Sequence, residues 1–288
     1  MKTLNWQKNV ILAPFTSFKI GGLAQYFLKV KDKKSLIKAL CFVKEKKIKL
    51  HILGLGSNVL IPDKGLRGLV LKLENKEVLV KKNRVLAGAG ISLSELLILT
   101  QKQGFCGLEW AAGIPGTLGG AIFGNAGAFA FSMADIVESV EVFDLKDGEI
   151  RVIKNKDCKF GYRQSIFSKK PNWVILSAAL KFVKDNKKKI KDRIKENLDY
   201  KKSRQPLNLP SAGSVFKNQK RIIAWQLIEK SGLKGKRIGR AQISEKHANF
   251  IVNLGGAKAR EVKELINLAE RTVKAKFKVK LEEEIIIL

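Results

Sequence analysis

Histidine and cysteine are scarce in this sequence. Its 288 residues include two histidines and three cysteines, Cys41, Cys106 and Cys158, which are odd in number and widely spaced. Neither a disulfide framework nor a zinc site fits this pattern, so we expect no metal and three reduced cysteines that fill the core. A chain of this length can bury a full hydrophobic core in two or three compact units without such crosslinks.

Long apolar runs are absent as well. The first twenty residues lack the continuous apolar segment of a secretory signal. No apolar run elsewhere approaches the ~18 residues that span a bilayer. We therefore expect a cytoplasmic protein with no membrane insertion.

Acidic residues are few beside basic ones, since 56 Lys and Arg face 26 Asp and Glu and give a formal net charge of +30. Such a charge favours nucleic-acid binding when the cations cluster. Here they are scattered, and the densest stretch, residues 185–204, spaces Ile190, Ile194 and Leu198 as on one face of a solvated helix. We expect a lysine-rich surface suited to small anions such as nucleotide diphosphates. A nucleic-acid-binding protein remains the non-enzyme alternative, although we expect no nucleic-acid partner.

Short apolar runs alternate with helical periodicities, which predicts a mixed α+β fold. Strands are expected at residues 25–30, 50–53, 68–73, 77–80, 85–87, 137–144, 173–182 and 250–254 and at the C-terminus. Helices are expected from residue 35, over 185–204, near 222–230 and through 262–273. A further helix begins at Ser92, forms a capping box with Glu95 and stops at Gly104. We expect three domains, residues 1–62, 63–185 and 186–288.

Glycine is concentrated where a core segment would carry branched side chains. Residues 113–128 contain a Gly-Ile-Pro-Gly turn, a Gly-Gly pair and an Asn-Ala-Gly-Ala turn. Glycine adds no packing and loses more entropy on folding than other residues, so such a cluster indicates backbone that approaches a ligand closely. A run of tight turns between strands is the alternative.

Two further glycine turns follow strand-like runs. Gly54-x-Gly56-x-x-Val59 begins like a dinucleotide fingerprint without its third glycine, and Gly88-Ala89-Gly90 is a second partial match. A Rossmann unit needs one such turn, whereas three turns separated by strands suit one extended ligand such as a flavin dinucleotide. The candidate cofactor contacts are Gly54, Leu55, Gly56, Ser57, Asn58, Val59, Leu60, Gly88, Ala89, Gly90, Gly113, Ile114, Pro115, Gly116, Thr117, Gly119, Gly120, Asn125, Gly127 and Ala128.

Ser214 lies in a further expected glycine turn, residues 211–218, and is followed by the cation Lys217 and the amide Asn218. A turn serine on the surface is the alternative to a functional one. No Gly-x-Ser-x-Gly context marks it as a nucleophile. A serine can still donate a proton where the alkoxide that remains is stabilised.

Three other side chains have both a functional and an ordinary interpretation. Arg163 is either a solvated loop charge or a fork that captures a carboxylate. Strand alternation predicts that Glu284 lies on the same face as Ile286 and Leu288, at the edge of an apolar row where its pKa would rise. The alternative is an exposed carboxylate on an edge strand. His247 precedes a strand and is either a ligand contact or a histidine satisfied by backbone.

The order of these motifs resembles the UDP-N-acetylenolpyruvoylglucosamine reductase family over essentially the whole chain. The matching segments, in order, are Thr16-Ser17-Phe18-Lys19-Ile20-Gly21-Gly22, Gly54-Leu55-Gly56-Ser57-Asn58, Gly113-Ile114-Pro115-Gly116, Asn125-Ala126-Gly127-Ala128, Tyr162-Arg163-Gln164-Ser165, the stretch from Ser211 to Asn218, and Lys246-His247-Ala248-Asn249-Phe250. The resemblance implies an FAD-binding fold of the vanillyl-alcohol-oxidase type over about residues 1–185. A C-terminal α+β substrate-binding domain follows.

The resemblance also implies a reaction. NADPH would reduce tightly bound FAD, which would then pass a hydride to the enolpyruvyl group of a UDP-sugar and give UDP-N-acetylmuramate for peptidoglycan synthesis. Ser214 would be the proton donor, and Arg163 and Glu284 would stabilise the enolate. Lys217, Asn218, His247 and Arg204 would contact the substrate. We expect a monomer.

Three features separate this chain from much of that family. The segment after Tyr162-Arg163-Gln164-Ser165 runs directly to the strand at residue 173, which resembles the shorter branch without a substrate-covering tyrosine loop. Phe129 stands where tyrosine is common, and Ile286 stands where arginine is usual, which puts one anionic contact in doubt. An FAD-dependent oxidase of the same fold with another substrate is the alternative enzyme.

Overall fold

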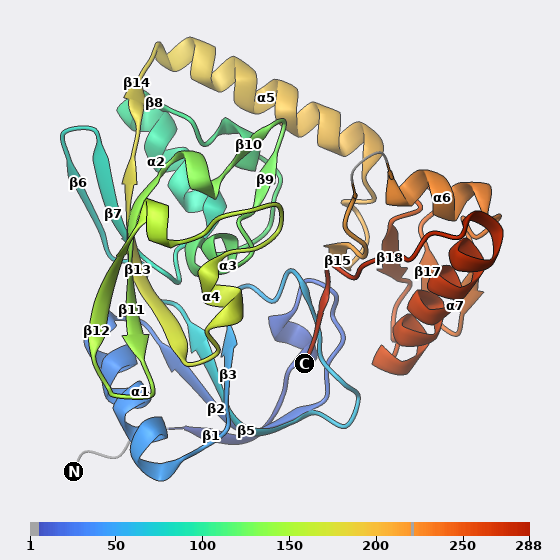
Figure 1. Cartoon of the computed structure of the whole chain (residues 1–288), viewed down its shortest axis with the longest axis horizontal. Coiled ribbons are helices and arrows are strands. Elements are labelled where there is room, and N and C mark those ends of the chain that lie inside the picture. The colour runs from blue at the N-terminus through green and yellow to red at the C-terminus, as the bar shows by residue number, and fades with distance from the viewer. Residues whose placement is uncertain (1–5, 220–221) are drawn as a thin grey trace. The chain divides into compact units, whose positions relative to one another are not determined.

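The computed structural model describes residues 6–219 and 222–288 (Figure 1). Helices and strands are interspersed along the chain, which confirms the expected α+β class. The chain forms two compact units. Of the described residues, unit 1 contains 6–7, 26–54 and 68–200, and unit 2 contains 8–25, 55–67, 201–219 and 222–288. Both units combine segments that are distant in sequence. The three expected domains stay a prediction, with residues 1–5 of the first and 220–221 of the third outside the described part.

Unit 1 is built on a five-stranded antiparallel sheet. In spatial order its strands are β12 (Ile150–Lys154), β11 (Val137–Asp144), β13 (Trp173–Lys181), β7 (Arg84–Gly88) and β6 (Val78–Lys81). Alternate side chains, including Leu176, Ala178 and Leu180 of β13, enter the core on one face of this sheet. On that face α3 (Leu118–Phe123) packs against β7 and β13.

Helix α2 (Leu93–Gln103) joins the same core and has the ends that the sequence predicts. The Ser92 side chain accepts from the Glu95 backbone N–H, and the Glu95 carboxylate accepts from the Ser92 N–H at 2.9 Å. Gly104 ends the helix at φ +66°, in the left-handed region that favours glycine. The capping box and the stop signal are therefore confirmed.

The N-terminal part of the chain forms a β-α-β arrangement. Helix α1 (Lys33–Lys46) follows β2 (Leu23–Val30) and precedes β3 (Leu50–Leu53), which pairs in parallel with β5 (Leu66–Leu73). With β1 (Gln7–Ile11) these strands form one sheet in the order β1-β2-β5-β3, divided between the two units. The helix begins two residues before the expected Ser35 because Asp32 accepts from the Ser35 N–H and caps it.

Unit 2 has a second antiparallel sheet with its own core. Its strands, in order, are β15 (Ser211–Ser214), β18 (Phe250–Asn253), β17 (Ala241–Ile243) and β16 (Arg237–Ile238). Helix α7 (Ala259–Phe277) buries Val262, Leu265 and Ile266 in this core, and α6 (Ala224–Lys230) adds Ile228. Near the C-terminus β19 (Ile286–Ile287) pairs in parallel with β4 (Val59–Leu60).

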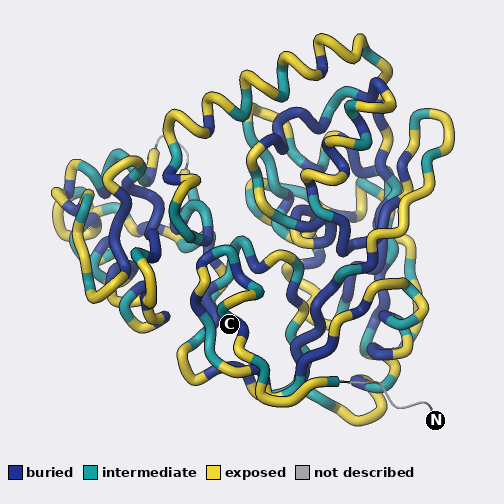
Figure 2. Tube along the Cα trace, turned by 180° about the vertical axis from the view of Figure 1, so that it is seen from behind, coloured by how far each residue is buried: buried dark blue, intermediate teal, exposed yellow. Residues whose placement is uncertain are grey.

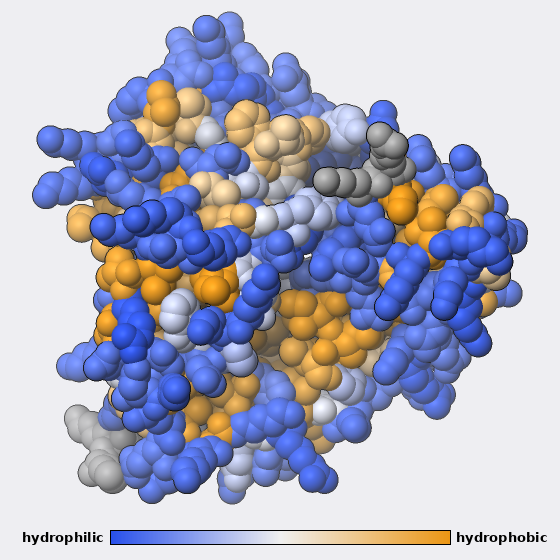
Figure 3. All heavy atoms as spheres, viewed as in Figure 1, coloured by the Kyte–Doolittle hydropathy of each residue, from blue (hydrophilic) through white to orange (hydrophobic). Residues whose placement is uncertain are grey.

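Helix α5 (Lys187–Arg204) is the charged helix that the sequence predicts. Ile190 is buried, and Ile194 and Leu198 pack against the core of unit 1, while the other faces are exposed (Figure 2). Arg193 anchors the helix through Glu109 and Asp185, each at 2.7 Å. Hydrophilic side chains also cover most of the face seen in Figure 3. The lysines of α5 other than the buried Lys201 thus form a solvated face.

Several short elements complete the chain. They are β8 (Phe105–Cys106) with β14 (Val183–Lys184), β9 (Gly127–Ala128) with β10 (Phe131–Ser132), α4 (Ile166–Lys169), and 3-10 turns at Ala13–Phe15, Glu109–Ala111, Met133–Asp135 and Asn155–Asp157. The longer elements that the sequence missed are β1, β12, β17 and α3, and the glycine turn expected at residue 211 is strand β15. The cysteines are free, but only Cys158 is a buried core residue; Cys41 is exposed.

Candidate active site

The first glycine loop leaves β3 at Gly54 and enters β4 at Val59. In unit 2, Gly56 has φ +64°, and a Cβ there would collide with the Phe15 carbonyl. Ser17 holds the Gly56 carbonyl through its backbone N–H at 3.1 Å. Among the residues that the structure describes, the backbone N–H groups of Leu55, Gly56 and Ser57 donate to no acceptor. Such groups suit an anion, so this loop fits the diphosphate of a dinucleotide.

The second loop, residues 113–117, lies in unit 1 and ends at Thr117, which caps α3. A Cβ at Gly54 would collide with the Thr117 hydroxyl, so glycine at that position lets the start of the first loop approach the second. Gly119 packs against Ala89, where a Cβ would lie 2.9 Å from the Ala89 Cβ. Gly120 is exposed, and a Cβ there would have only the Thr117 hydroxyl nearby, at 3.5 Å. The backbone at Gly120, in the first turn of α3 just after this loop, is therefore open to a ligand.

The third glycine turn has an internal explanation. Cβ atoms at Gly88 and Gly90 would collide with Asn75, which is fully buried. Asn75 accepts from the Gly90 N–H through its side chain at 3.0 Å and donates to the Leu176 carbonyl at 2.9 Å. The chain itself requires glycine at both positions, and a cofactor contact of Gly88-Ala89-Gly90 remains a prediction.

Asn125 connects a predicted cofactor loop with the loop of Arg163. Its side chain donates to the Gly161 carbonyl at 2.9 Å and accepts from the Ala134 N–H at 3.0 Å. Arg163 itself is half-buried at φ +53°, with its guanidinium 5.1 Å from the Tyr162 ring centre. A non-glycine residue in this conformation is strained, and such strain clusters at functional sites.

Unit 2 brings Ser214 and Glu284 together through a single residue. Val215 follows Ser214 and accepts from the Glu284 backbone N–H at 2.7 Å. Asn58 of the first glycine loop donates through its side chain to the Glu284 carbonyl at 3.0 Å. The predicted proton donor, the predicted carboxyl group and one end of a predicted cofactor loop are thus neighbours along the backbone of one unit.

The face that Glu284 occupies differs from the prediction. Ile285 is 4% exposed and belongs to the core, whereas Ile286 is 37% exposed. The apolar row therefore contains Ile285 rather than Ile286, and the expectation that Glu284 borders a buried row was wrong. The reason is that Leu281 and Ile285 are the side chains that enter the core of unit 2, so the face with Ile286 is the more exposed one.

Asn249 was missed by the sequence reasoning, although it lies in one of the matching motifs. It is 4% exposed, and its side chain pairs with both backbone groups of Phe216, accepting from the N–H at 2.9 Å and donating to the carbonyl at 2.8 Å. Its own carbonyl accepts from the Val215 N–H at 2.8 Å. Asn249 therefore holds the segment after Ser214 from the side opposite Glu284. Its place in the motif Lys246-His247-Ala248-Asn249-Phe250 was the sequence signal that could have found it.

His247 has a backbone hydrogen-bond partner, as expected for a histidine that is satisfied by the backbone. Its Nδ1 accepts from the Asn249 N–H at 3.3 Å, and its ring packs against Phe250 and Trp225. Burial lowers the pKa of His247, which favours the neutral ring. A substrate contact through the remaining nitrogen stays a prediction.

The other predicted substrate residues also lie in unit 2. The Lys217 ammonium is 3.9 Å from the Glu282 carboxylate. Asn218 accepts from the Ala224 N–H at 3.1 Å and so holds the start of α6, while Arg204 is exposed at the end of α5. The Asn218 side chain thus has a structural bond in addition to its predicted role.

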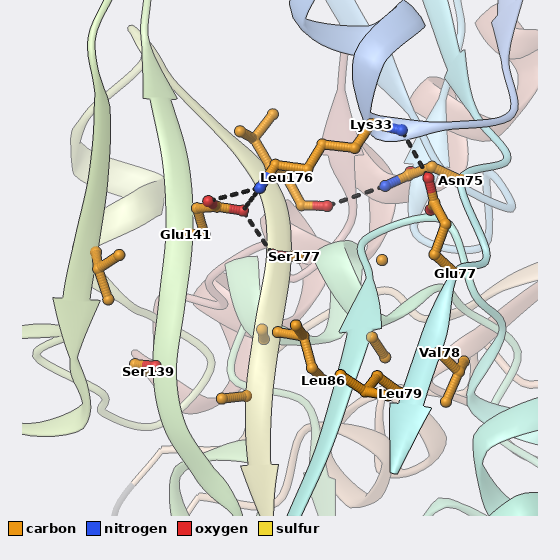
Figure 4. Close-up of a pocket in the computed structure, with 15 residues that line it drawn as sticks. Lys33, Asn75, Glu77, Val78, Leu79, Leu86, Ser139, Glu141, Leu176 and Ser177 are labelled. Carbon is orange, nitrogen blue, oxygen red and sulfur yellow. Dashed lines mark hydrogen bonds and ion pairs between the residues drawn. The ribbon is translucent and has the colours of Figure 1, made fainter. Parts of the chain in front are cut away.

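A groove of about 350 Å³ lies on the other face of the unit 1 sheet (Figure 4). The Lys33 ammonium donates to Glu141 at 2.7 Å, and Ser177 donates to the same carboxylate at 2.8 Å. Exposed Leu79 and Leu86 border it. Of the predicted site residues, Gly88 alone is in its lining, so the groove is distinct from the candidate active site.

None of the helices in residues 6–219 and 222–288 combines the length and the hydropathy of a membrane-spanning segment. Over the same ranges, no group of three His, Cys, Asp or Glu side chains is placed to hold a metal.

Comparison with known proteins first gives the class. An FAD binding domain matches residues 24–154, the part that contains the glycine loops, so the chain is a flavoprotein. The C-terminal domain of UDP-N-acetylenolpyruvoylglucosamine reductase matches residues 205–288, the part that contains Ser214 and Glu284.

Relatives over the whole length then give the family. The UDP-N-acetylenolpyruvoylglucosamine reductase of Caldanaerobacter subterraneus is 43% identical and covers 94% of this chain and 89% of the relative. Reductase 1 of Bacillus cereus is 41% identical, over 97% and 93%. The crystal structure of the Thermus caldophilus reductase has a TM-score of 0.85 at 34% identity, with 99% of both chains covered. The chain belongs to the UDP-N-acetylenolpyruvoylglucosamine reductase family, as the order of its motifs predicts.

Proposed function

We propose that this chain is an FAD-dependent oxidoreductase that reduces UDP-N-acetylenolpyruvoylglucosamine to UDP-N-acetylmuramate for peptidoglycan synthesis, with NADPH as the reductant. One observation carries the proposal. In unit 2 the backbone of Val215 joins Ser214 to Glu284, and Asn58 joins Glu284 to the first glycine loop. The family relationship extends over both parts of the chain that would be needed.

The glycine loops would hold the cofactor. The open N–H groups of Leu55, Gly56 and Ser57 suit its diphosphate, and the bare backbone at Gly120 allows close approach. Bound FAD supplies hydride chemistry that no side chain of this chain can provide. Dependence on FAD follows from the matched FAD binding domain.

Hydride addition to the enolpyruvyl double bond places negative charge next to the substrate carboxylate. In our proposal Ser214 donates a proton to the α-carbon of this enolate, and Arg163 and Glu284 stabilise the charge while it builds up. Groups that bind the enolate more tightly than the substrate lower the barrier. A protonated Glu284 would donate a hydrogen bond to it.

Lys217, Asn218, His247 and Arg204 are proposed to contact the UDP-sugar. We further propose that the enzyme is a monomer that works in the cytoplasm. The three free cysteines suit a reducing compartment.

Anaerobic half-reactions test the function. The purified protein should be yellow, lose flavin absorbance on addition of NADPH, and regain it on addition of UDP-N-acetylenolpyruvoylglucosamine without oxygen. A protein that bleaches but is not reoxidised by this substrate would instead be an oxidase with another substrate. A colourless protein retained on DNA in a salt-sensitive way would contradict the flavin function.

A further inference from the structure

Arg163 lies in a tight turn of unit 1 that does not favour arginine. Tyr162 and Arg163 connect Gly161 to Gln164, and the latter two residues exchange both backbone hydrogen bonds, at 3.0 and 3.2 Å. Arg163 has φ +53°. A positive φ at the third position of a turn is normally adopted by glycine or asparagine, because other side chains are strained there. A strained arginine that persists indicates a function that needs this side chain at this position.

Both ends of this turn are held by residues at the end of α3. Ser165 follows the turn, and its hydroxyl donates to the Phe123 carbonyl at 2.7 Å. Before the turn, the Gly161 carbonyl accepts from the Asn125 side chain at 2.9 Å. Ser165 is 1% exposed and Asn125 is 6% exposed, so both hydrogen bonds are shielded from water, which strengthens them. The backbone around Arg163 is therefore fixed at two points by a segment that is distant in sequence.

The hydroxyl of Ser165 serves this anchor rather than the helix that follows it. Ser165 is the N-cap residue of α4, a position that favours serine because its oxygen can accept from a backbone N–H of the first turn. In the part of the chain that the structure describes, its side chain makes no such capping bond. It donates instead to Phe123, the last residue of α3, whose carbonyl has no partner within its own helix. The neighbouring helices α3 and α4 are thus joined at this serine (Figure 1).

Helix α3 also connects this anchor with a predicted cofactor loop. Thr117 ends the loop of residues 113–117 and caps the start of α3. Ala121 and Ile122 of this helix are buried in the core of unit 1. A short helix packed into a dense core moves little. It therefore fixes where the turn of Arg163 lies relative to this loop, and all of these groups belong to one unit.

We propose that Ser165 is a positioning residue for Arg163, with Asn125 as its counterpart on the other side of the turn. Together they hold the backbone of Arg163 against the end of α3, so that the guanidinium is presented from one fixed place. The proposal rests on the proposed function in that Arg163 stabilises the charge of the enolate. Such stabilisation depends on accurate placement, so loss of the Ser165 anchor should slow the substrate step and spare the reduction of FAD by NADPH.

Single variants of the full-length flavoprotein give the first test. Reduced protein is mixed with UDP-N-acetylenolpyruvoylglucosamine without oxygen, and stopped-flow absorbance of the flavin gives the rate of reoxidation. We expect Ser165→Ala to slow reoxidation at least about 10-fold, with reduction by NADPH unchanged within about 2-fold. Ser168→Ala is the matched control, because the Ser168 hydroxyl donates to the Ser165 carbonyl at 2.8 Å within the same short segment and not to α3. It should leave both rates unchanged.

A double variant separates positioning from a general structural role. Arg163→Met should slow reoxidation more than Ser165→Ala does. In the Arg163→Met background, Ser165→Ala should cause no further loss, because its effect passes through Arg163. If Ser165→Ala slowed reoxidation by the same factor in both backgrounds, Ser165 would act independently of Arg163 and the proposal would be wrong. Unchanged reoxidation, or equal slowing of both half-reactions, would also contradict it.

Thermal unfolding checks that Ser165→Ala folds. If it does not, Ser165→Cys replaces it in the same comparison with Arg163→Met, because a thiol has a similar size and is a weaker donor. Hydrogen exchange of residues 161–165, followed by mass spectrometry, should be faster in the variant than in the wild type, and unchanged exchange would show that the anchor does not hold the turn. Failure of the proposed function would give a different result. Wild-type flavin would then be reduced by NADPH but not reoxidised by this substrate, whereas hydrogen exchange would still report whether Ser165 fixes the turn.

Discussion

Val215 is the residue on which the geometry of the candidate site depends most. Its N–H is bound by Asn249 and its carbonyl by Glu284, so both sides of its backbone are fixed. Ser214 precedes it directly, and a shift at Val215 would move Ser214 and Glu284 relative to each other. Hydrogen bonds to backbone, rather than contacts between the two functional side chains, therefore set their spacing.

Replacement of Ser214 tests its role as the proton donor. In Ser214→Ala, reduction of FAD by NADPH should be nearly intact, whereas reoxidation by the enolpyruvyl substrate should slow by about 100-fold or more, because a positioned acid is missing. Stopped-flow absorbance of the flavin measures both half-reactions. Ser211→Ala, on the same strand, serves as the control. An equal loss in both half-reactions would show that Ser214 has another role.

Short elements of this fold carry their own boundary signals. The capping box of α2 uses only Ser92 and Glu95, three residues apart, and its stop uses Gly104. These hydrogen bonds join residues that are close in sequence, so they do not depend on what the helix packs against. They are the reason that this helix could be predicted to within a residue.

The capping box should make stability depend on acid. Burial tends to raise the pKa of Glu95, but hydrogen bonds from Lys76 and Ser92 outweigh it and lower the pKa to about 2. Since the folded value lies below the ordinary 4.5, its contribution is present above pH 4.5 and is lost as the pH falls towards 2. In urea unfolding, Glu95→Gln should cost about 0.5–1 kcal/mol at neutral pH, because the exposed part of the carboxylate is screened.

The difference between the wild type and Glu95→Gln should disappear near pH 2. Glu45→Gln, a change on the exposed face of α1, should show little difference at either pH. A difference between wild type and Glu95→Gln that persists unchanged at low pH would contradict the assigned hydrogen bonds.

At the scale of the whole molecule, the main features are the net charge of +30 and two units whose segments alternate along the sequence. The many positive charges repel one another, and salt screens this repulsion. We expect the melting temperature to rise by a few degrees between low and physiological ionic strength in sodium chloride, measured by circular dichroism.

Charge reversal on α5 provides the matched control for this salt effect. A variant with Lys188→Glu, Lys191→Glu and Lys195→Glu, all exposed, lowers the net charge and should show a weaker dependence on salt. A wild-type melting temperature that falls with added salt would show that attractive ion pairs, such as Arg193 with Glu109, dominate instead.

The sequence alone determined what depends on neighbours along the chain. The α+β class, the ends of α2, the solvated face of α5 and the family itself were predictable because spacing and short motifs encode them. The glycine loops were recognisable for the same reason, because residues without a side chain can be identified directly from the sequence.

Only the tertiary structure decided which distant segments meet. It placed Asn75 against Gly88 and Gly90, joined Val215 to Glu284, and put Ile285 rather than Ile286 in the core. It also decided which lysines of residues 6–219 and 222–288 are buried, namely Lys72 and Lys201, and burial lowers the pKa of Lys201 to about 8. The physical reason is that strand pairing and burial depend on contacts between remote parts of the chain, and the spacing of residues within any one segment does not record them.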